Sequence, residues 1–266
     1  MNKYGSDLFK GAAQYYSKYR PMYPASLVRF LVDRCALSGG EQLLDLGCGT
    51  GQLTIRFSDW CHKIVGIDTE PEMIKEASRI HNELRFGNIE WFSGSLEYYR
   101  KNNDEKFKLV TIAKAFHWMD RAKVLEHLYD MVTVDGGVSI IDNYNPASKL
   151  TTWQITLNEV VKHWYGSERK AGNTIYDHPN ESHEDILSNS SFHVEIHELP
   201  PYEITWTIET ILGNLYSTSY GSKRFLGNKV EAFEHDLRSS LLAINNSGIF
   251  KEQVDLSVKL GIKELL

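Results

Sequence analysis

Cysteine is scarce in this chain of 266 residues, and long apolar runs are missing from it. The three cysteines, Cys35, Cys48 and Cys61, are too few and too scattered for a disulfide framework or a zinc site. No run approaches the ~18 apolar residues of a membrane span, and residues 1–5 contain no apolar signal region. The histidines between 163 and 197 lack a recognised ligand spacing. We therefore expect a cytoplasmic protein without a metal site or a membrane partner.

An excess of basic charge is also missing. The chain has 29 lysines and arginines against 35 aspartates and glutamates, for a formal net charge of −6. Proteins that bind nucleic acids by electrostatics carry a basic patch or a high pI, so we expect no nucleic-acid partner. The composition, 42% hydrophobic and 24% charged, is that of an ordinary globular protein. It predicts one large α/β domain, or such a domain with a cap.

A glycine turn follows the first apolar run, at residues 43–46. Glycine stands at alternate positions from 47 to 51, and residues 52–57 have helical spacing. Such a strand, turn and helix exposes backbone N–H groups at the carboxyl end of a central strand. Gln52 stands where a dinucleotide fingerprint needs its third glycine, and no lysine follows the turn as a phosphate loop requires. The spacing therefore argues against NAD and against a nucleoside triphosphate.

With this turn the sequence resembles the class I S-adenosylmethionine (SAM) methyltransferases, whose first motif looks like Leu43–Gly51. The resemblance implies SAM as the cofactor and S-adenosylhomocysteine as its product. In that family the turn receives the amino-acid end of SAM, and the acid at the position of Asp45 lies near its ammonium group. The residues assigned to the cofactor on this ground are Asp45, Gly47, Cys48, Gly49 and Gly51.

The second expected strand, residues 63–68, ends in an acid. Asp68 lies seventeen residues after Gly51, and an acid at this strand end accepts hydrogen bonds from ribose hydroxyls in doubly wound folds. Thr69 begins the helix that follows. The phrase that includes Met73 resembles the second motif of the family, in which this methionine position is often near the adenine. Asp68, Thr69 and Met73 are therefore expected at the cofactor.

The third expected strand leaves through Gly94, Ser95 and Leu96. The family commonly has Gly-Asp-Ala-Glu here, with the aspartate bonding the adenine amine. Ser95 stands at the aspartate position, which is a departure from the pattern. A hydroxyl still accepts that hydrogen bond, with less charge assistance. We expect Ser95 and the backbone N–H of Leu96 to meet the adenine.

An aromatic segment precedes the first expected helix. Two prolines at 21 and 24 favour an extended or turning chain here. The segment resembles the Y-x-x-x-R-P-x-Y-P stretch of the trans-aconitate-methyltransferase-like branch, the type 11 group, in which it helps to cover SAM. Tyr16 and Arg20 are therefore expected in a lid over the cofactor; the alternative is a surface strap.

The fourth expected strand, residues 107–112, runs into Ala113 and then into a His-Trp pair. The segment resembles the A-x-H-W-x-D signature of the same branch. We expect Ala113 at the cofactor, His117 as a general base and Trp118 as a wall on the substrate side. The alternative for His117 is a buried, hydrogen-bonded histidine. Three further residues are expected on the substrate side, namely Tyr144, Ser217 and Tyr220.

Alternating strands and helices predict an α/β fold. We expect a Rossmann-like, doubly wound, mostly parallel sheet of seven strands, with the last strand antiparallel and a helical cap inserted. Strands are expected at 41–46, 63–68, 89–93, 107–112, 138–142, 192–199, 202–206 and 254–262, and helices at 25–37, 50–60, 120–132, 153–165, 208–220 and 229–244. The predicted parts are 1–145 (lid and SAM-binding core), 146–235 (cap) and 236–266 (helix end and last strand), in one compact domain overall.

The leading hypothesis is an enzyme, a SAM-dependent methyltransferase of class EC 2.1.1.-, acting on a small-molecule acceptor. The acceptor would be a carboxylate, a phenol or another oxygen or nitrogen nucleophile, methylated by in-line displacement. Two alternatives remain, namely an NAD-dependent oxidoreductase on the same kind of sheet and a SAM-binding protein without transfer activity. No pattern in the sequence points to an oligomeric state.

Overall fold

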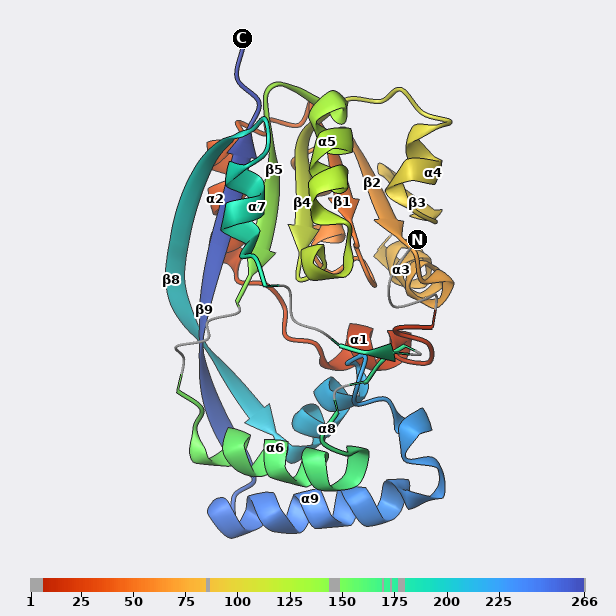
Figure 1. The fold of residues 1–266 in the computed structure, drawn as a ribbon, viewed down its shortest axis with the longest axis vertical. Helices are drawn as coiled ribbons and strands as arrows, with labels where there is room; N and C mark the ends of the chain where they lie inside the picture. The colour runs from red at the N-terminus through yellow and green to blue at the C-terminus, as the bar shows by residue number, and fades with distance from the viewer. Residues whose placement is uncertain are drawn as a thin grey trace.

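The computed structural model describes residues 7–84, 87–143, 149–168, 170–172, 174–176 and 180–265. Its centre is a seven-stranded sheet in the order β3-β2-β1-β4-β5-β9-β8 (Figure 1). Within that sheet only β9 runs antiparallel to both of its neighbours. The strands are β1 (Gln42–Leu46), β2 (Lys63–Asp68), β3 (Ile89–Ser93), β4 (Phe107–Ala113), β5 (Val132–Asp142), β8 (His193–Thr207) and β9 (Ile249–Ile262). The predicted doubly wound sheet with an antiparallel last strand is confirmed.

Helices cover both faces of this sheet. One face packs against α4 (Leu96–Arg100), α5 (Arg121–Met131) and α7 (His183–Ser188), and the other against α2 (Ala25–Arg34) and the short 3-10 helix η1 (Thr54–Phe57). Because both faces are covered, the central strands are almost continuously apolar, and Leu43, Leu44, Leu109 and Val110 are fully buried. Further helices are α1 (Ala13–Tyr19) and α3 (Pro71–Leu84).

A second lobe lies beyond the carboxyl ends of the strands, at the bottom of Figure 1. Its helices are α6 (Thr152–Tyr165), α8 (Ile208–Tyr216) and α9 (Val230–Ile244). They pack around the fully buried Phe233 and against Trp206 of β8 and Phe250 of β9. The whole of α9 belongs to this lobe, so the boundary expected between 235 and 236 falls inside a helix. A small hairpin, β6 (Lys170–Ala171) and β7 (Thr174–Ile175), lies near the N-terminal segment.

The strands β8 and β9 are longer than expected and reach into both lobes. Where the sequence predicted strands at 192–199 and 202–206, one strand of 15 residues runs from His193 to Thr207. Its pairing with β9 is irregular between Leu199 and Tyr202, because Pro200 and Pro201 have no N–H to donate. The two expected strands are therefore one strand with an interruption.

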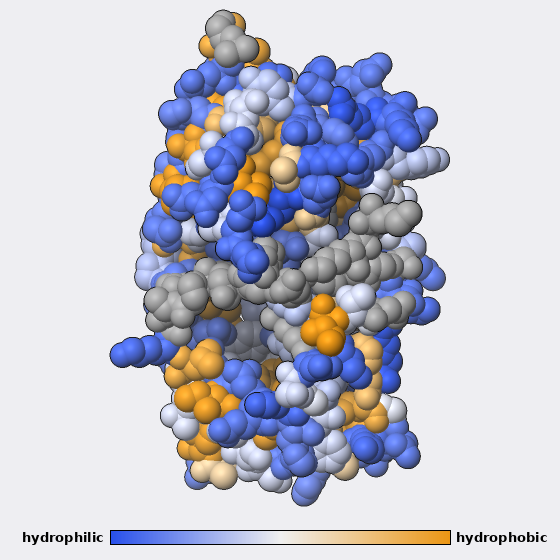
Figure 2. All heavy atoms as spheres, in the orientation of Figure 1, coloured by the Kyte–Doolittle hydropathy of each residue, from blue (hydrophilic) through white to orange (hydrophobic). Residues whose placement is uncertain are grey.

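Figure 2 shows a mostly hydrophilic surface, with hydrophobic residues at the left of the upper lobe and on the lower lobe. Large apolar side chains that remain exposed near α6, the end of α9 and the start of β9 are Leu150, Ile155, Leu242, Ile244 and Ile249. In the part of the chain that the structure describes, no helix is long and apolar enough to cross a membrane.

The helix predicted at 50–60 is wrong. Only residues 54–57 are helical, and they form a 3-10 helix. Arg56 and Trp60 donate their N–H groups to carbonyls three residues back, and the hydroxyl of Ser58 donates to the carbonyl of Ile55. Side chains that bond the local backbone in this way compete with the α-helical ladder.

Other parts of the chain also differ from what was expected. Helix α8 ends at Tyr216 rather than 220, since the hydroxyls of Ser217 and Thr218 donate to carbonyls three residues back. The N-terminal segment, expected as extended or turning chain, contains α1 up to Tyr19, and the extended backbone begins at Arg20. Strand β5 begins at Val132 rather than 138, and it contains Asp135 at φ +56°.

Candidate active site

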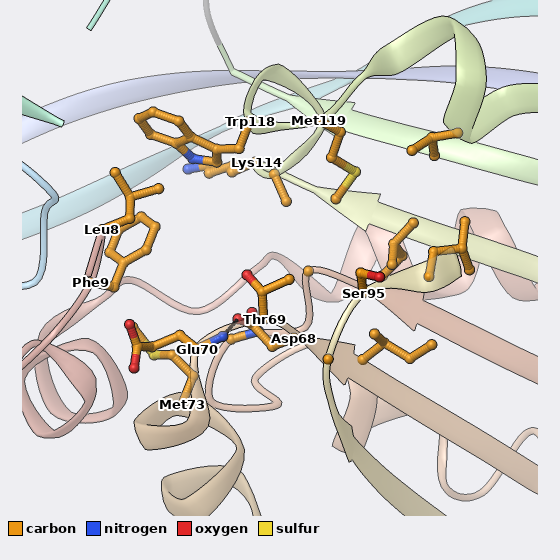
Figure 3. Close-up of a pocket in the computed structure, with 18 of the residues that line it drawn as sticks. Leu8, Phe9, Asp68, Thr69, Glu70, Met73, Ser95, Lys114, Trp118 and Met119 are labelled. Atoms are coloured by element: carbon orange, nitrogen blue, oxygen red, sulfur yellow. Dashed lines mark hydrogen bonds between the residues drawn. The ribbon is translucent and has the colours of Figure 1, made fainter. Parts of the chain in front are cut away.

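A cavity of about 450 Å³ lies at the carboxyl ends of the central strands. This volume lies within the range of small-molecule and cofactor sites. The cavity is lined by the glycine turn after β1, by the exits of β2, β3 and β4, and by the N-terminal segment. Figure 3 shows Asp68 and Thr69 in its middle, Ser95 at one end, and Lys114 and Trp118 towards the other. This is the crevice in which doubly wound folds bind their ligands.

Asp68 joins the end of β2 to the glycine turn. Its Oδ2 atom accepts from the N–H of Gly49 and its Oδ1 atom from the N–H of Glu70, both at 2.9 Å. Burial raises the pKa of this carboxyl, and the backbone donors oppose the rise. A carboxylate offers about four acceptor positions, so capacity remains for ribose hydroxyls. Thr69 and Met73 line the cavity beside it.

The sequence interpretation did not include Glu70. This residue lines the cavity and is 7% exposed. Its Oε2 atom is buried without a hydrogen-bond partner among the described residues, and burial raises the pKa of the carboxyl. A buried acceptor without a partner is costly, which fits a ligand that donates to it. Glu70 lies two residues after Asp68 and directly before α3. This position in the sequence could have indicated that it lies at the ligand site.

A side chain is excluded at different glycines of the turn by different neighbours. A Cβ atom on Gly47, at φ +74°, would lie 2.5 Å from the Cβ of Ala115 across the cavity wall. A Cβ on Gly51, at φ +79°, would lie 2.4 Å from the Trp91 ring. Gly47 and Gly49 line the cavity, whereas Gly51 and the buried Cys48 lie behind it. The structure thus brings two of these four residues to the cavity surface.

Asp45 lies below the turn and links two elements. Its carboxylate accepts from the hydroxyl of Thr54 at 2.5 Å and from that of Thr111 at 2.7 Å. Burial raises its pKa to about 6, against the opposing effect of the two hydroxyls. Asp45 is 2% exposed and is not among the lining residues. Its contact with the cofactor's ammonium group stays a prediction.

The exit of β3 brings Ser95 and Leu96 to the cavity, and their contact with an adenine stays a prediction. The Ser95 hydroxyl also caps α4, because it accepts from the N–H of Tyr98 at 3.2 Å. A hydroxyl has two acceptor positions and one donor, so this cap leaves one acceptor position for an adenine amine. Glu97 lines the same end of the cavity, and the sequence analysis did not assign it.

The N-terminal segment covers the cavity from the side of the lower lobe. Leu8, Phe9 and Tyr16 line it. Gln52, next to the glycine turn, donates to the carbonyl of Arg20 at 3.3 Å and to that of Tyr16 at 3.5 Å. The residue that breaks the dinucleotide fingerprint thus ties the segment to the turn.

Arg20 lies behind Tyr16 rather than in the cavity lining. Its guanidinium is 5.0 Å from the centre of the Tyr16 ring, and it donates to the carbonyl of Ser217 at 3.4 Å. Its Nε atom has no partner among the described residues. Contact between Arg20 and the cofactor stays a prediction.

The exit of β4 contributes Ala113, Lys114, Ala115 and Trp118 to the lining. Lys114 was missed by the sequence analysis. It has φ +53°, one of three non-glycine residues at positive φ in the described chain, and such strained backbone clusters at functional sites. Its N–H donates to the carbonyl of Ile141 at 2.9 Å, which ties this turn to β5.

His117 is not among the residues that line the cavity. Its ring packs on Trp118, with 4.5 Å between ring centres, and on Tyr176 at 6.0 Å. It also stacks on His183 at 6.4 Å. The expected role as a base therefore stays a prediction, whereas its partner Trp118 does reach the cavity.

Two of the expected substrate-side residues lie in the lower lobe. Ser217 is fully buried, and its hydroxyl donates to the carbonyl of Asn214 at 2.5 Å. Tyr220 packs against the core of the lower lobe. Neither lines the cavity. Tyr144 lies outside the described residues.

Comparison with known proteins agrees with this geometry. Residues 43–136 match a protein-family model described as a methyltransferase domain. A probable S-adenosylmethionine-dependent methyltransferase of Saccharomyces cerevisiae, CRG1, is 28% identical over 123 residues, which are 46% of this chain and 42% of the yeast protein. Residues 43–136 are thus similar in sequence to methyltransferase domains, one of them SAM-dependent by its description. SAM is accordingly the cofactor that these comparisons support.

Other relatives of this domain come from fission yeast and from bacteria. An uncharacterized methyltransferase of Bacillus subtilis, YcgJ, is 27% identical over 124 residues, which are 46% of each chain. The chain thus spans about half the length of the curated relatives it matches. None of the reported matches identifies the trans-aconitate branch, and that finer resemblance stays a prediction.

Solved structures resemble the chain beyond the matched domain. The crystal structure of YcgJ has a TM-score of 0.56 at 18% identity, covering 90% of this chain and 98% of that one. A SAM-dependent methyltransferase from Thiobacillus denitrificans, in complex with S-adenosylhomocysteine, has a TM-score of 0.51 at 18% identity and covers 94% and 96%. At these identities the likeness concerns the fold, which extends through both lobes.

Proposed function

We propose that this chain transfers a methyl group from SAM to a small-molecule acceptor. The observation that carries the proposal is the cavity that joins the glycine turn, Asp68 and the exit of β4 within a methyltransferase domain. When bound, SAM supplies a methyl group on a sulfonium sulfur; an acceptor oxygen or nitrogen bonds to that carbon as the carbon–sulfur bond breaks, leaving S-adenosylhomocysteine. The cavity volume of about 450 Å³ fits a ligand of this size.

The adenosine part belongs at the β2 and β3 side. Asp68 has acceptor capacity for the ribose hydroxyls, and the buried Oε2 atom of Glu70 offers a further acceptor. Ser95 and Leu96 supply a hydroxyl and an N–H for the adenine edge, and Met73 an apolar surface. Together these groups match the hydrogen-bonding pattern of an adenosine, which both donates and accepts.

The reacting end belongs at the exit of β4. Much of the rate of such a displacement comes from holding the two reactants in line, and Ala113, Ala115 and Trp118 form the wall beside this point. A carboxylate acceptor is already ionised and needs no base. A phenol, an amine or an alcohol benefits from one, and His117 is our candidate base for such acceptors.

Calorimetric titration with SAM, S-adenosylhomocysteine and NAD tests the proposal. We expect micromolar binding of the first two and none of NAD. Release of S-adenosylhomocysteine from SAM in the presence of small carboxylic acids and phenols then tests transfer. Binding of NAD alone would contradict the proposal and favour hydride transfer, and cofactor binding without transfer to any acceptor would favour a non-catalytic SAM-binding protein.

A further inference from the structure

Lys114 is a cation at the cavity to which the described chain gives no anionic partner. No carboxylate oxygen of the described residues lies within 4.0 Å of its Nζ atom. By contrast, at least one ion pair is formed by each of Arg34, Lys63, Arg79 and Arg100. Its Nζ atom lies over the ring of Tyr23, 5.8 Å from the ring centre. A charged group held in this way is costly unless something else pairs with it.

The electrostatic surroundings place this ammonium away from the adenosine side. The charges that act on it are those of Arg20, Asp142 and Glu252, from the end of α1, from β5 and from β9. Asp68, Glu70 and Glu97, which line the adenosine side, are not among them. Figure 3 likewise shows Lys114 beside Trp118 and far from Ser95. The side chain therefore belongs to the Trp118 end of the cavity, away from Ser95.

Arg20, the cation that acts most strongly on Lys114, also has no carboxylate partner among the described residues. Arg20 forms no ion pair among the described residues, and its Nε atom is buried without a partner. Arg20 lowers the pKa of Lys114 further, after the larger effect of burial, to about 8. Arg20 thus adds to the positive potential at Lys114 from outside the cavity lining. The two carboxylates that oppose this potential, Asp142 and Glu252, lie beyond ion-pair distance of Lys114. An anion bound beside Lys114 would supply the missing partner.

We propose that Lys114 is the residue that binds the methyl acceptor, and that the acceptor carries a carboxylate which pairs with its ammonium group. This inference rests on the proposed function, since it assigns the side of the cavity that the cofactor leaves open. A second source of a carboxylate is the amino-acid end of SAM itself. The experiment below separates the two sources.

The first measurement is calorimetric binding of two probes to wild type, Lys114→Met and Lys108→Met. The probes are S-adenosylhomocysteine and 5′-methylthioadenosine, which lacks the amino-acid carboxylate. Lys108→Met is the matched control, because it removes the same charge from the other end of β4, where Nζ donates to the carbonyl of Asp135. We expect all three proteins to bind each probe within two-fold.

The second measurement uses the three proteins saturated with S-adenosylhomocysteine. Succinate and benzoate are compared with their neutral amides, at matched ionic strength, by the shift in Tm. We expect the carboxylates to raise the Tm of wild type and of Lys108→Met, and the effect to be lost in Lys114→Met. The shift should fade above about pH 8, as the ammonium loses its proton. Lys114→Gly, which accepts φ +53° without strain, should fold at least as well and lose the shift too.

Each other result decides against the proposal. A ten-fold loss of S-adenosylhomocysteine affinity in Lys114→Met, with 5′-methylthioadenosine unaffected, would assign Lys114 to the cofactor's carboxylate. Equal carboxylate shifts in wild type and Lys114→Met, or no shift in wild type, would also overturn it. Failure of wild type to bind S-adenosylhomocysteine at all would instead refute the proposed function.

Discussion

The carboxylate of Asp68 and the backbone N–H of Gly49 are hydrogen-bonded at 2.9 Å, so the end of β2 holds the glycine turn that follows β1. One residue thus shapes the turn and offers acceptors to a ribose. Substitutions of Asp68 that keep or remove its acceptor oxygens should therefore differ in their effect on cofactor affinity.

Asp68→Ala should weaken the binding of S-adenosylhomocysteine. Loss of hydrogen bonds to a charged group costs about 1.5–3 kcal/mol, which is a roughly 10- to 150-fold higher Kd. Asp68→Asn keeps one acceptor oxygen and the shape of the side chain, so its loss should be smaller. Titration calorimetry on folded variants measures both. Unchanged affinity in Asp68→Ala would remove Asp68 from the cofactor site.

Gly51→Ala should destabilise the fold although Gly51 does not line the cavity. The new Cβ atom would meet the Trp91 ring at 2.4 Å, at a backbone φ of +79°. Left-handed backbone and overpacking together lower the free energy of unfolding by about 2–5 kcal/mol. Denaturant unfolding measures this loss.

Gly87→Ala is the control for that experiment. Nothing lies within 4 Å of the Cβ position of Gly87, and its φ is outside the positive range. Its free energy of unfolding should stay within about 0.5 kcal/mol of wild type. Equal effects of the two substitutions would contradict the steric reason given for Gly51.

Asp45→Asn should change how stability depends on pH. Burial raises the pKa of Asp45 to about 6 in the folded chain, above the unfolded value of about 3.9. The folded state therefore binds more protons between these values, and the contribution of Asp45 to stability falls as pH rises from about 4 to 6. Relative to Asp45→Asn, wild type should lose up to about 3 kcal/mol across this window.

Chemical unfolding of both proteins at pH 4, 5, 6 and 7 measures that difference. The amide oxygen of Asn accepts from only one of the two hydroxyls, and its NH2 group donates to the other. That change affects stability equally at every pH, so the pH dependence isolates the charge. Parallel curves for the two proteins would mean that Asp45 is not protonated more readily in the folded state.

His117→Ala should affect acceptors unequally if His117 is a base. Transfer to a phenol should slow, and the difference from wild type should shrink towards low pH, because a protonated imidazole cannot accept the proton. Transfer to a carboxylate needs no base and should change little. Both rates are measured over pH 5–9, with the affinity for SAM as the control. An equal loss for both acceptors would assign His117 to the packing around Trp118.

The sheet was predictable from the sequence because its strands are buried on both faces. Apolar runs at 43–46, 64–67 and 109–112 leave few other arrangements, and the glycine turn marks where they meet a ligand. The same positions give Asp68, Thr69, Met73, Ser95 and Leu96, all of which line the cavity.

Residues whose role depends on packing across the chain were not predictable in this way. Gly51 matches the motif of a ligand site, yet its space is taken by Trp91, forty residues later. Lys114 follows a strand like many surface lysines, and only the fold encloses it between Tyr23 and the β5 edge. The prediction of a helix at 50–60 was wrong. The Ser58 hydroxyl bonds the local backbone there, and the spacing of hydrophobic residues carries no information about such a bond.

The continuous run of β8 and β9 decides how the lower lobe is attached. Thirteen residue pairs join the two strands from one lobe to the other, so backbone hydrogen bonds, rather than a flexible linker, carry the lobe. The pairing of the two strands is regular except at Pro200 and Pro201, where hydrogen bonds between them are missing. Bending of the lobe relative to the sheet would concentrate there, where the pairing of β8 with β9 is interrupted.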